Sequence, residues 1–434
     1  MMKLLIPSDI IEVTGDIQQC LLLAEQQGFA IEHIELGVSP TRTLQLISNQ
    51  DHFAVATDLL DRDQIQTTEY DCCLCYLSAA SIESLTMDSR KVFIHLTDSN
   101  GDKYDVWTNP FNHQRQALRI TESILLSRAA MCRHLAWFIT LSALGFPLED
   151  SLTLARAMLN VSRETWAFEY FAFPTPVLEH KDLDIRLEWQ LANLYKSFPK
   201  LEPHSLGLYP VVDSVEWIEQ LLPLGIKTIQ LRIKQPERVD LEAQIIRAIE
   251  LGREYNAQVF INDYWQLAIK HGAFGVHLGQ EDLQASNITQ LAGAGIALGL
   301  STHGYYELLR IVQLAPSYIA LGHIFPTTTK QMPSQPQGLT RLALYQKLID
   351  TIPYGEQKGI PTVAIGGIDL GNASQVWQTG VSSLAVVRAI TQANDVQTAI
   401  SDFKQVMVSN SEQRSFATSL HYDHLHKECR HVEQ

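Results

Sequence analysis

Short apolar runs alternate with longer amphipathic runs through the second half of the chain, and each pair spans some 20 to 35 residues. This spacing is typical of strand–helix units, in which one parallel strand reaches the next through a helix. The pattern predicts strands at 208–212, 228–232, 258–261, 275–278, 296–300, 318–321, 361–365 and 383–387.

The amphipathic segments between these runs predict helices, for example at 240–255, 305–314 and 373–379. A glycine follows or interrupts several of them, as expected where helices end. Eight strand–helix pairs in about 200 residues predict an α/β protein with a (β/α)₈ TIM barrel. A doubly wound open sheet is the alternative, but no Gly-rich dinucleotide turn follows the first predicted strand.

Polar side chains follow the second predicted strand at its carboxyl end, where barrels of this kind carry their active sites. That strand runs into Gln230-Leu231-Arg232-Ile233-Lys234. The two-residue period of a strand places Gln230, Arg232 and Lys234 on one face. Two cations at a barrel mouth are costly unless an anion meets them, so this segment predicts an anionic ligand.

Most of the other predicted strands also end in groups that can bind a ligand. Each has an ordinary explanation as well, because Asn-Asp often makes a turn and Gly-Gly often makes a tight bend. His303 is interpreted as a cap of the following helix and is not assigned to the site. Their concentration at one end of the barrel favours an active site. The groups are Asn262, Asp263, Asp282, Ser301, Gly366 and Gly367.

The segment 325–330, after the sixth predicted strand, is rich in hydroxyl groups and contains Lys330. It lacks an apolar period and contains Pro326, so it is predicted to be a loop. A solvated surface loop is one interpretation. Its place at the end of a barrel strand favours a loop that closes over a phosphorylated ligand.

The predicted site suits a magnesium-bound pyrophosphate. Carboxylate oxygens from Asp263 and Asp282 are ligands that Mg²⁺ prefers, and it is usually shared with substrate phosphates. Arg232, Lys234 and Lys330 would donate charge-assisted hydrogen bonds to phosphate oxygens. No nucleophilic Cys or His is placed for acyl transfer, so departure of pyrophosphate as a leaving group is the chemistry that these residues indicate.

The chain from about 207 to 407 resembles the thiamine phosphate synthase family, whose successive motifs it matches in order. The matching segments are 208–213, 230–234, 261–263, 275–283, 300–303, 322–330, 364–368 and 385–390. The resemblance implies that hydroxymethylpyrimidine diphosphate loses pyrophosphate and that the nitrogen of a thiazole phosphate attacks the methylene carbon. It implies a dissociative displacement that yields thiamine phosphate.

The resemblance also implies roles for individual residues. Those that bind the pyrimidine diphosphate are Gln230, Leu231, Arg232, Ile233, Lys234, Asn262, Ser301 and Lys330. Of these, Arg232, Lys234, Ser301 and Lys330 are expected to be catalytic, and Asp263 and Asp282 are expected to hold Mg²⁺. Those that bind the thiazole phosphate are Thr327, Thr328, Thr329, Gly367, Val387 and Arg388. Many members carry a small Ser at the position of Arg388. The Arg would keep the backbone hydrogen bond but would lack the contact that the Ser hydroxyl makes.

Residues 1–195 predict a separate α/β domain, because 434 residues exceed one barrel and strand-like runs occur at 3–6, 53–56 and 92–96. The segments 141–150 and 155–160 resemble the C-terminal helices of ribokinase-type hydroxymethylpyrimidine phosphate kinases. In those kinases a Gly-rich turn just upstream binds the transferred phosphoryl group. The corresponding segment 128–133 contains no glycine, which predicts a kinase-derived domain without phosphoryl transfer. The barrel is expected at 203–408 and a flexible His-rich tail at 409–434.

Composition limits the partners. A formal charge of −15 argues against nucleic acid, and no apolar run reaches the ~18 residues of a membrane span. The start of the chain lacks a signal-peptide pattern, so a cytoplasmic enzyme acting on small molecules is expected. A homo-oligomer stays compatible with the sequence. The cluster at 72–75 is interpreted as buried free thiols, with zinc as the alternative.

Three functional hypotheses remain open. The first is the pyrophosphate-releasing synthase, and a bifunctional form would add kinase activity from the N-terminal domain. The second is a barrel relative that isomerises a thiazole phosphate, which would not need the two carboxylates and three cations together. The third is a regulatory or scaffolding role dominated by residues 1–195.

Overall fold

The protein divides into two units in the computed structural model, which describes residues 1–49, 51–60, 69–77, 81–82, 88–121, 127–186, 197–327 and 335–409. The first unit comprises Met1–Leu187 together with Gly304–Gln313. The second comprises Glu188–His303 and Leu314–Gln434. Each unit has its own sheet, and no helix of the described ranges is long and apolar enough to cross a membrane.

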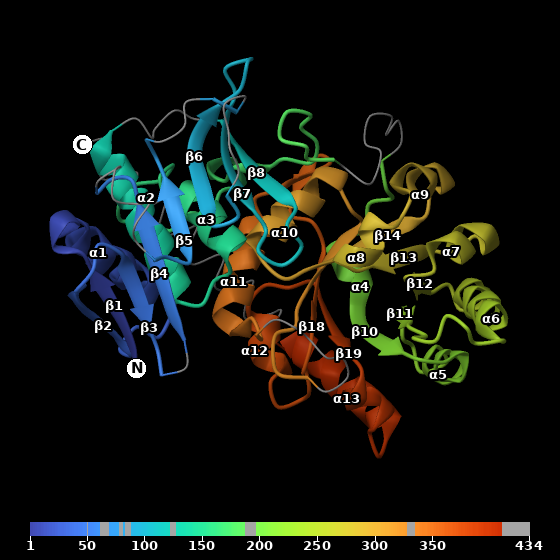
Figure 1. Ribbon diagram of the computed structural model, residues 1–434. Helices are drawn as coiled ribbons and strands as arrows, with labels where there is room; N and C mark the ends of the chain where they lie inside the picture. The colour runs from blue at the N-terminus through green and yellow to red at the C-terminus, as the bar shows by residue number, and fades with distance from the viewer. Residues whose placement is uncertain are drawn as a thin grey trace, which may run out of the picture. The chain divides into compact units, whose positions relative to one another are not determined.

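The second unit contains a closed barrel of eight parallel strands, so the predicted barrel is confirmed (Figure 1). Pairing of Gly207 with Ser383 and of Pro210 with Val386 closes the cylinder between the first and last strands. In order around the barrel, the strands are β10 (Gly207–Val212), β11 (Thr228–Leu231), β12 (Gln258–Asn262), β13 (Gly275–Leu278), β14 (Ala297–Thr302), β15 (Tyr318–Leu321), β18 (Thr362–Ile365) and β19 (Ser383–Val386).

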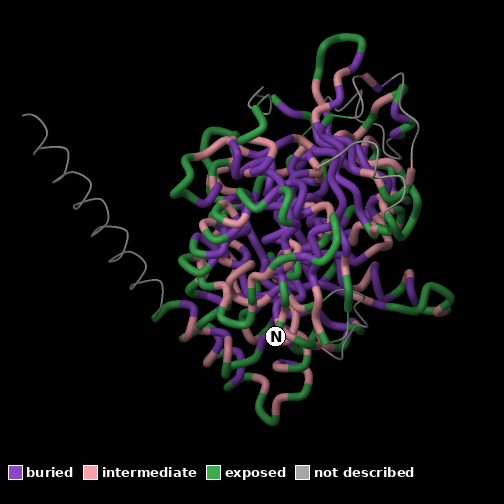
Figure 2. Tube along the Cα trace, turned by 60° about the vertical axis from the view of Figure 1, so that its left-hand side comes forward, coloured by how far each residue is buried: buried purple, intermediate pink, exposed green. Residues whose placement is uncertain are grey.

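Large aromatic side chains fill the barrel interior. Tyr209, Phe260 and Tyr318 are buried there and lie edge to face or tilted, with ring centroids 5.1–5.9 Å apart. Gly275 and Gly299 leave room for them, because a Cβ at either position would overlap the ring of Phe260 or Tyr318. The barrel strands are buried along nearly their whole length, and Figure 2 shows the buried parts of the chain in purple.

Helices surround the outside of the barrel, and α5, α6, α7 and α9 flank β10–β14 in Figure 1. Gly272 and Gly295 end α7 and α9 in the left-handed conformation, as the sequence predicts. A short hairpin of β16 (Pro353–Tyr354) and β17 (Gln357–Lys358) was not predicted. The helices of this unit include α4 (Pro203–Leu206), α5 (Val215–Leu221), α6 (Leu241–Glu254), α7 (Trp265–His271), α8 (Gln280–Gln284), α9 (Ile288–Ala294), α11 (Gly338–Ile349), α12 (Ala373–Gln378) and α13 (Arg388–Thr391).

The first unit is built on a mixed nine-stranded sheet with the order β2-β1-β3-β4-β5-β6-β7-β8-β9. The runs predicted at 3–6, 53–56 and 92–96 lie within β1, β4 and β6. Its strands are β1 (Met2–Ile6), β2 (Ile34–Val38), β3 (Leu44–Ile47), β4 (His52–Thr57), β5 (Cys72–Cys75), β6 (Lys91–Thr97), β7 (Lys103–Thr108), β8 (Arg115–Ile120) and β9 (Thr175–Pro176).

Three longer helices belong to the first unit: α1 (Val13–Gln26), α2 (Arg128–Ala143) and α3 (Leu148–Ala157). Arg156 of α3 is fully buried, and its guanidinium donates to both carboxylate oxygens of Asp105 at 2.9 and 2.6 Å. Paired in this way, two buried charges satisfy each other. The cysteines of β5 are buried and free, which confirms their interpretation as core thiols.

The segment Gly304–Gln313 groups with the first unit although it directly follows barrel strand β14. It forms α10 (Tyr305–Ile311) and a short 3₁₀ helix, Val312–Leu314, in agreement with the predicted helix at 305–314. Within the first unit, Tyr305 stacks on Phe173 with centroids 5.5 Å apart, and the Tyr306 N–H donates to Asp150 at 2.9 Å.

Candidate active site

A cavity of about 610 Å³ opens at the carboxyl ends of the barrel strands. Its size lies in the range that ordinary small-molecule sites occupy. Its wall includes residues from all eight barrel strands or the loops that follow them. Among those are Tyr209, Gln230, Arg232, Lys234, Asn262, Asp263, His277, Asp282, Ser301, Tyr318, Ala320, Val363, Ile365, Gly367 and Val387.

Two cations line one side of the cavity just beyond β11. Arg232 and Lys234 both contribute to the wall, whereas Leu231 and Ile233 do not and are 1% and 2% exposed. This alternation follows from the two-residue period of an extended chain. Burial lowers the pKa of the Arg232 guanidinium, and Asp263 and Asp282 oppose that effect.

Two carboxylates face each other beside these cations. Asp263 follows β12 in a left-handed conformation, with φ of 63°, and Asp282 lies in the first turn of α8 after β13. Burial, then the charge of Asp282 and a hydrogen bond to it, raise the pKa of Asp263 to about 6, while Lys234 and Arg232 act against the rise. A pair of carboxylates held together in this way favours a bound proton or a bound cation.

The donor set at this pair fits a hard divalent cation that keeps other ligands. Within the described ranges no group of three or more His, Cys, Asp or Glu side chains is placed to hold a metal. Asp263 and Asp282 would therefore supply only two protein ligands. Water or phosphate oxygens would complete the shell, as they usually do around Mg²⁺.

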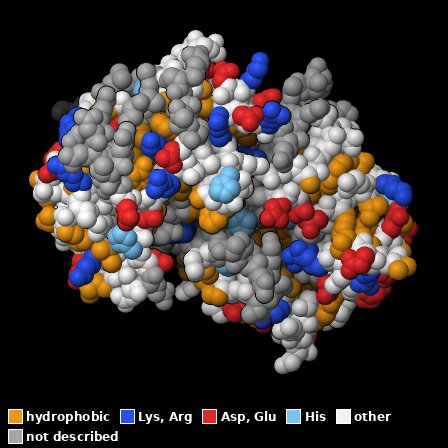
Figure 3. Space-filling model, in the orientation of Figure 1, with side chains coloured by type: hydrophobic (Ala, Val, Ile, Leu, Met, Phe, Trp, Pro, Cys, Tyr) orange, Lys and Arg blue, Asp and Glu red, His pale blue; other side chains and the backbone are white. Residues whose placement is uncertain are grey.

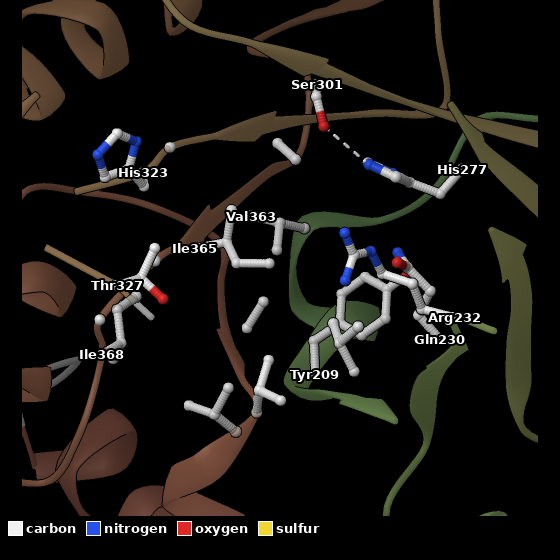
Figure 4. Close-up of a pocket in the computed structure, with 18 of the residues that line it drawn as sticks. Tyr209, Gln230, Arg232, His277, Ser301, His323, Thr327, Val363, Ile365 and Ile368 are labelled. Carbon is white, nitrogen blue, oxygen red and sulfur yellow. Dashed lines mark hydrogen bonds between the residues drawn. The ribbon is translucent and has the colours of Figure 1, made fainter. Parts of the chain in front are cut away.

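A polar, uncharged floor lies below the carboxylates. Ser301 and His277 hydrogen-bond through Oγ and Nε2 at 2.9 Å, as Figure 4 shows. The His277 Nδ1 lies 2.8 Å from the Tyr318 hydroxyl, which in turn lies 2.9 Å from that of Tyr209. Asn262 adds an amide whose Nδ2 is buried and has no protein partner in the described part of the chain.

The opposite side of the cavity is apolar and exposes backbone. Val363 and Ile365 form its centre, and Thr327 and Ile368 lie beyond them in Figure 4. The turn after β18 contains two glycines with positive φ, and a Cβ on the second, Gly367, would come within 2.8 Å of the loop that contains Phe325 and Pro326. Only glycine gives the backbone this close approach.

The last strand completes that side. Val387 is the N-cap of α13, which begins at Arg388, so backbone N–H groups of its first turn have no intrahelical acceptor. The exposed Arg388 side chain also lines the cavity.

Most of the sequence-predicted site residues are thus gathered around one cavity. Thr328, Thr329 and Lys330 fall outside the described residues. His303, which was interpreted as a helix cap, lines the cavity. Tyr209, His277 and Tyr318 were missed, although the alternation of inward positions on their strands could have indicated them.

Three comparisons with known proteins bear on this site. The family profile described as thiamine monophosphate synthase matches residues 208–390, entirely within the barrel unit apart from the segment 304–313. Thiamine-phosphate synthases from Shigella sonnei and Escherichia coli are each 55% identical over 210 residues, which are 48% of this chain and 95% of the relative. A solved thiamine phosphate pyrophosphorylase from Pyrococcus furiosus is 29% identical with a TM-score of 0.41, over 48% of this chain and 98% of its own.

Proposed function

The chain belongs to the thiamine-phosphate synthase family, and from that premise we propose how its barrel residues divide the work between two substrates. The barrel is a thiamine-phosphate synthase of thiamine biosynthesis. Its proposed substrates are hydroxymethylpyrimidine diphosphate and a thiazole phosphate. Its proposed products are thiamine phosphate and pyrophosphate.

The pyrimidine diphosphate binds on the side of the cavity that carries charge. Arg232 and Lys234 donate to the diphosphate oxygens, and the uncharged floor with Asn262 and Ser301 receives the pyrimidine ring. The observation that carries this assignment is the placement of two cations and two facing carboxylates on one rim, directly above uncharged polar groups.

Asp263 and Asp282 are the proposed Mg²⁺ ligands. Their facing carboxylates and the raised pKa of Asp263 support a site that gains from a cation. When bound, the ion would offset negative charge that grows on the departing pyrophosphate.

The thiazole phosphate binds on the apolar side. Its ring would lie against Val363 and Ile365, while Gly367 and the first turn of α13 offer backbone N–H groups to the phosphate. Arg388 would add a charged donor at the mouth. Thr327 lines the same region, and Thr328, Thr329 and Lys330 are assigned there or to the diphosphate from the family resemblance alone.

The reaction proceeds by departure of pyrophosphate before the new bond forms. The bond between the methylene carbon and the diphosphate oxygen breaks, and its electron pair leaves with pyrophosphate, whose charge Arg232 and Lys234 stabilise. The amino-substituted ring delocalises the positive charge that remains on the methylene carbon. The thiazole nitrogen, held across the cavity, then donates its lone pair to that carbon.

Residues 1–195 form a kinase-derived domain that no longer transfers phosphoryl groups. The segment that replaces the Gly-rich turn begins α2, where Ser127 caps the helix and accepts from the Ala130 N–H at 3.2 Å. That N–H is therefore already used, and the alanine side chains restrict approach to the others. Incubation with ATP and hydroxymethylpyrimidine should give no phosphorylated product, and measurable turnover would make the protein bifunctional.

Pyrophosphate release tests the function of the barrel directly. The full chain with both substrates and Mg²⁺ should release pyrophosphate and form thiamine phosphate in equal amounts. Omission of the thiazole phosphate should stop formation of thiamine phosphate, because the thiazole nitrogen is the nucleophile. Isomerisation of a thiazole phosphate without pyrophosphate release would instead support the alternative barrel activity.

A further inference from the structure

Four buried side chains form a hydrogen-bonded relay that ends at Ser301. The Gln230 Nε2 donates to the Tyr209 hydroxyl at 3.3 Å, and that hydroxyl lies 2.9 Å from the Tyr318 hydroxyl. Tyr318 contacts the His277 Nδ1 at 2.8 Å, and the His277 Nε2 contacts the Ser301 Oγ at 2.9 Å. We call Gln230, Tyr209, Tyr318 and His277 the relay.

The relay crosses four different strands, and its side chains are almost fully buried. Tyr318 and Tyr209 are 0% and 1% exposed, and Gln230 and His277 are 5% and 7% exposed. Buried polar groups of this kind must satisfy one another, because an unpaired donor or acceptor carries its full desolvation cost. The direction of each hydrogen bond therefore constrains the next.

Gln230 sets that direction. Its amide nitrogen can only donate, so the Tyr209 oxygen accepts that hydrogen bond, and the single hydrogen of Tyr209 is left available for Tyr318. The Tyr318 hydrogen then goes to the His277 Nδ1. A neutral imidazole with Nδ1 as acceptor carries its proton on Nε2 and donates it to Ser301.

We propose that the relay fixes the Ser301 hydroxyl as a hydrogen-bond donor toward a ring nitrogen of the pyrimidine substrate, with Tyr318 and His277 as positioning residues. This inference rests on the proposed seat of the pyrimidine ring. Once its oxygen accepts from His277, the remaining hydrogen of Ser301 is free to point into the cavity. The relay thus selects which edge of the ring faces β14.

An acceptor edge is what this floor requires. The Asn262 Nδ2 is a second buried donor without a protein partner in the described ranges, and it lines the same floor. A donor such as the Ser301 hydroxyl meets the lone pair of a ring nitrogen, whereas an exocyclic amino group would face it with its own hydrogens. The diphosphate already has Arg232 and Lys234 at the rim, so its oxygens do not need Ser301.

Packing holds the relay in this geometry. The His277 and Tyr318 rings are stacked at an interplanar angle of 17° with centroids 5.7 Å apart, and Phe260 contacts Tyr318 edge to face. Gly299 allows this, because a side chain there would overlap the Tyr318 ring. The rings cannot rotate without disturbing the barrel core, so the hydroxyl of Tyr318 stays on His277.

Nitrogen-15 NMR of the full chain tests the direction of the relay. The chain has 15 histidines, so the His277 signals are assigned by their loss in His277→Gln. The wild type should show a bare Nδ1 and a protonated Nε2. In Tyr318→Phe the two shifts should move toward each other, because the hydrogen bond from Tyr318 that favours one tautomer is lost. Tyr209→Phe keeps the Tyr318–His277 contact but removes the hydrogen bond that sets its direction, so the two shifts should move part of the way toward each other.

Steady-state kinetics distinguish a positioning role of Tyr318 from a general contribution to the stability of the barrel. Tyr318→Phe should raise the KM for the pyrimidine diphosphate about tenfold, with kcat changed much less. Tyr354→Phe is the matched control, because it removes a buried hydroxyl, bonded to Leu201 and Ser317, that does not line the cavity. Tyr354→Phe should lower the melting temperature about as much as Tyr318→Phe does. It should leave the KM and the His277 nitrogen shifts unchanged.

Three outcomes would overturn the proposal. A wild-type His277 protonated at Nδ1 would reverse the relay, and equal kinetics for Tyr318→Phe and Tyr354→Phe would remove its positioning role. Calorimetry with Ser301→Ala tests the ligand atom: weaker binding of inorganic pyrophosphate but unchanged binding of hydroxymethylpyrimidine would replace the ring nitrogen with a phosphate oxygen. Unchanged binding of both, with the expected tautomer, would instead show that the proposed seat of the pyrimidine is wrong.

Discussion

The Asp263 and Asp282 carboxyls face each other at the mouth of the barrel, each following one of the two neighbouring strands β12 and β13. Two like charges at this distance repel each other, and burial adds to the cost. A proton relieves this repulsion below the raised pKa of Asp263, and a bound cation would relieve it above that pH. The cations Arg232 and Lys234 offset part of that cost without removing the rise in the pKa of Asp263.

Replacing either carboxylate should therefore separate activity from stability. Asp263→Asn or Asp282→Asn should lower Mg²⁺-dependent turnover by at least about 10²-fold, the scale expected when an electrostatic clamp on a transition state is lost. The melting temperature without Mg²⁺ should not fall, because the substitution removes repulsion. Pyrophosphate release and thermal unfolding measure the two effects.

Glu281→Gln is the control for this pair. Glu281 lies in the same first turn of α8, is exposed and does not line the cavity. It should keep wild-type turnover and Mg²⁺ dependence. If either Asn variant at Asp263 or Asp282 behaved like Glu281→Gln at low Mg²⁺, the two-carboxylate metal site would be refuted.

The affinity for Mg²⁺ should depend on pH through Asp263. Its pKa is raised to about 6, so the proton competes with the cation below that pH and not above it. Affinity should be constant from pH 7 to 8 and fall roughly tenfold per unit below about 6, as one competing proton requires. Calorimetric titration of the full chain with Mg²⁺ at several pH values measures this, and a flat profile from pH 5 to 8 would contradict it.

The glycine turn after β18 supports a separate prediction for the second substrate. Gly367→Ala places a Cβ within 2.8 Å of the Phe325 Cβ and the Pro326 oxygen, at a φ of 67° that alanine disfavours. The turn or the adjacent loop must shift, so the KM for the thiazole phosphate should rise at least tenfold while Mg²⁺ affinity stays unchanged. Gly293→Ala, which faces open space in α9, is the control. Equal effects on both substrates would indicate general damage to the barrel.

How much of this structure the sequence predicts depends on how far apart in the chain the interacting residues lie. The barrel strands follow from a local period, and so does the shared face of Gln230, Arg232 and Lys234. The contacts of Tyr318 with His277 and Tyr209 span 41 and 109 residues, so they exist only once the barrel has closed. The same limit applies to the first unit, where the sequence predicted three of the strands but not the order of the mixed sheet.

Asp150 predicts how the stability of the first unit changes with pH. Its side chain is buried, and burial, with added repulsion from Glu149 and Glu307, raises its pKa to about 7. In the unfolded chain the Asp150 carboxyl has a pKa of about 3.9, so it loses its proton at a lower pH than in the folded chain. Stability is therefore fully present below about pH 4 and declines up to about pH 7, by an amount on the order of 4 kcal/mol.

Asp150→Asn should remove that decline. Wild type and variant should melt alike at pH 4, where both side chains are neutral, and the variant should melt at a higher temperature at pH 8. The Tyr306 N–H keeps an acceptor in the variant. Thermal unfolding across this pH range decides the matter, and identical pH profiles would show that Asp150 is ionised without cost.

A shortened chain that begins at Leu201 should fold and keep synthase activity. The relatives that match it support this, because 210 residues make up 95% of their length. All proposed site residues lie beyond Leu201, and a closed barrel completes its own core. The shortened chain keeps Tyr305 and Tyr306 but loses Phe173 and Trp107, which pack on them within the first unit. We therefore expect near-normal kcat with lower solubility, and replacing both tyrosines with Gln should restore solubility. Pyrophosphate release measures kcat, and its loss in a folded, soluble fragment would assign residues 1–195 a direct part in the reaction.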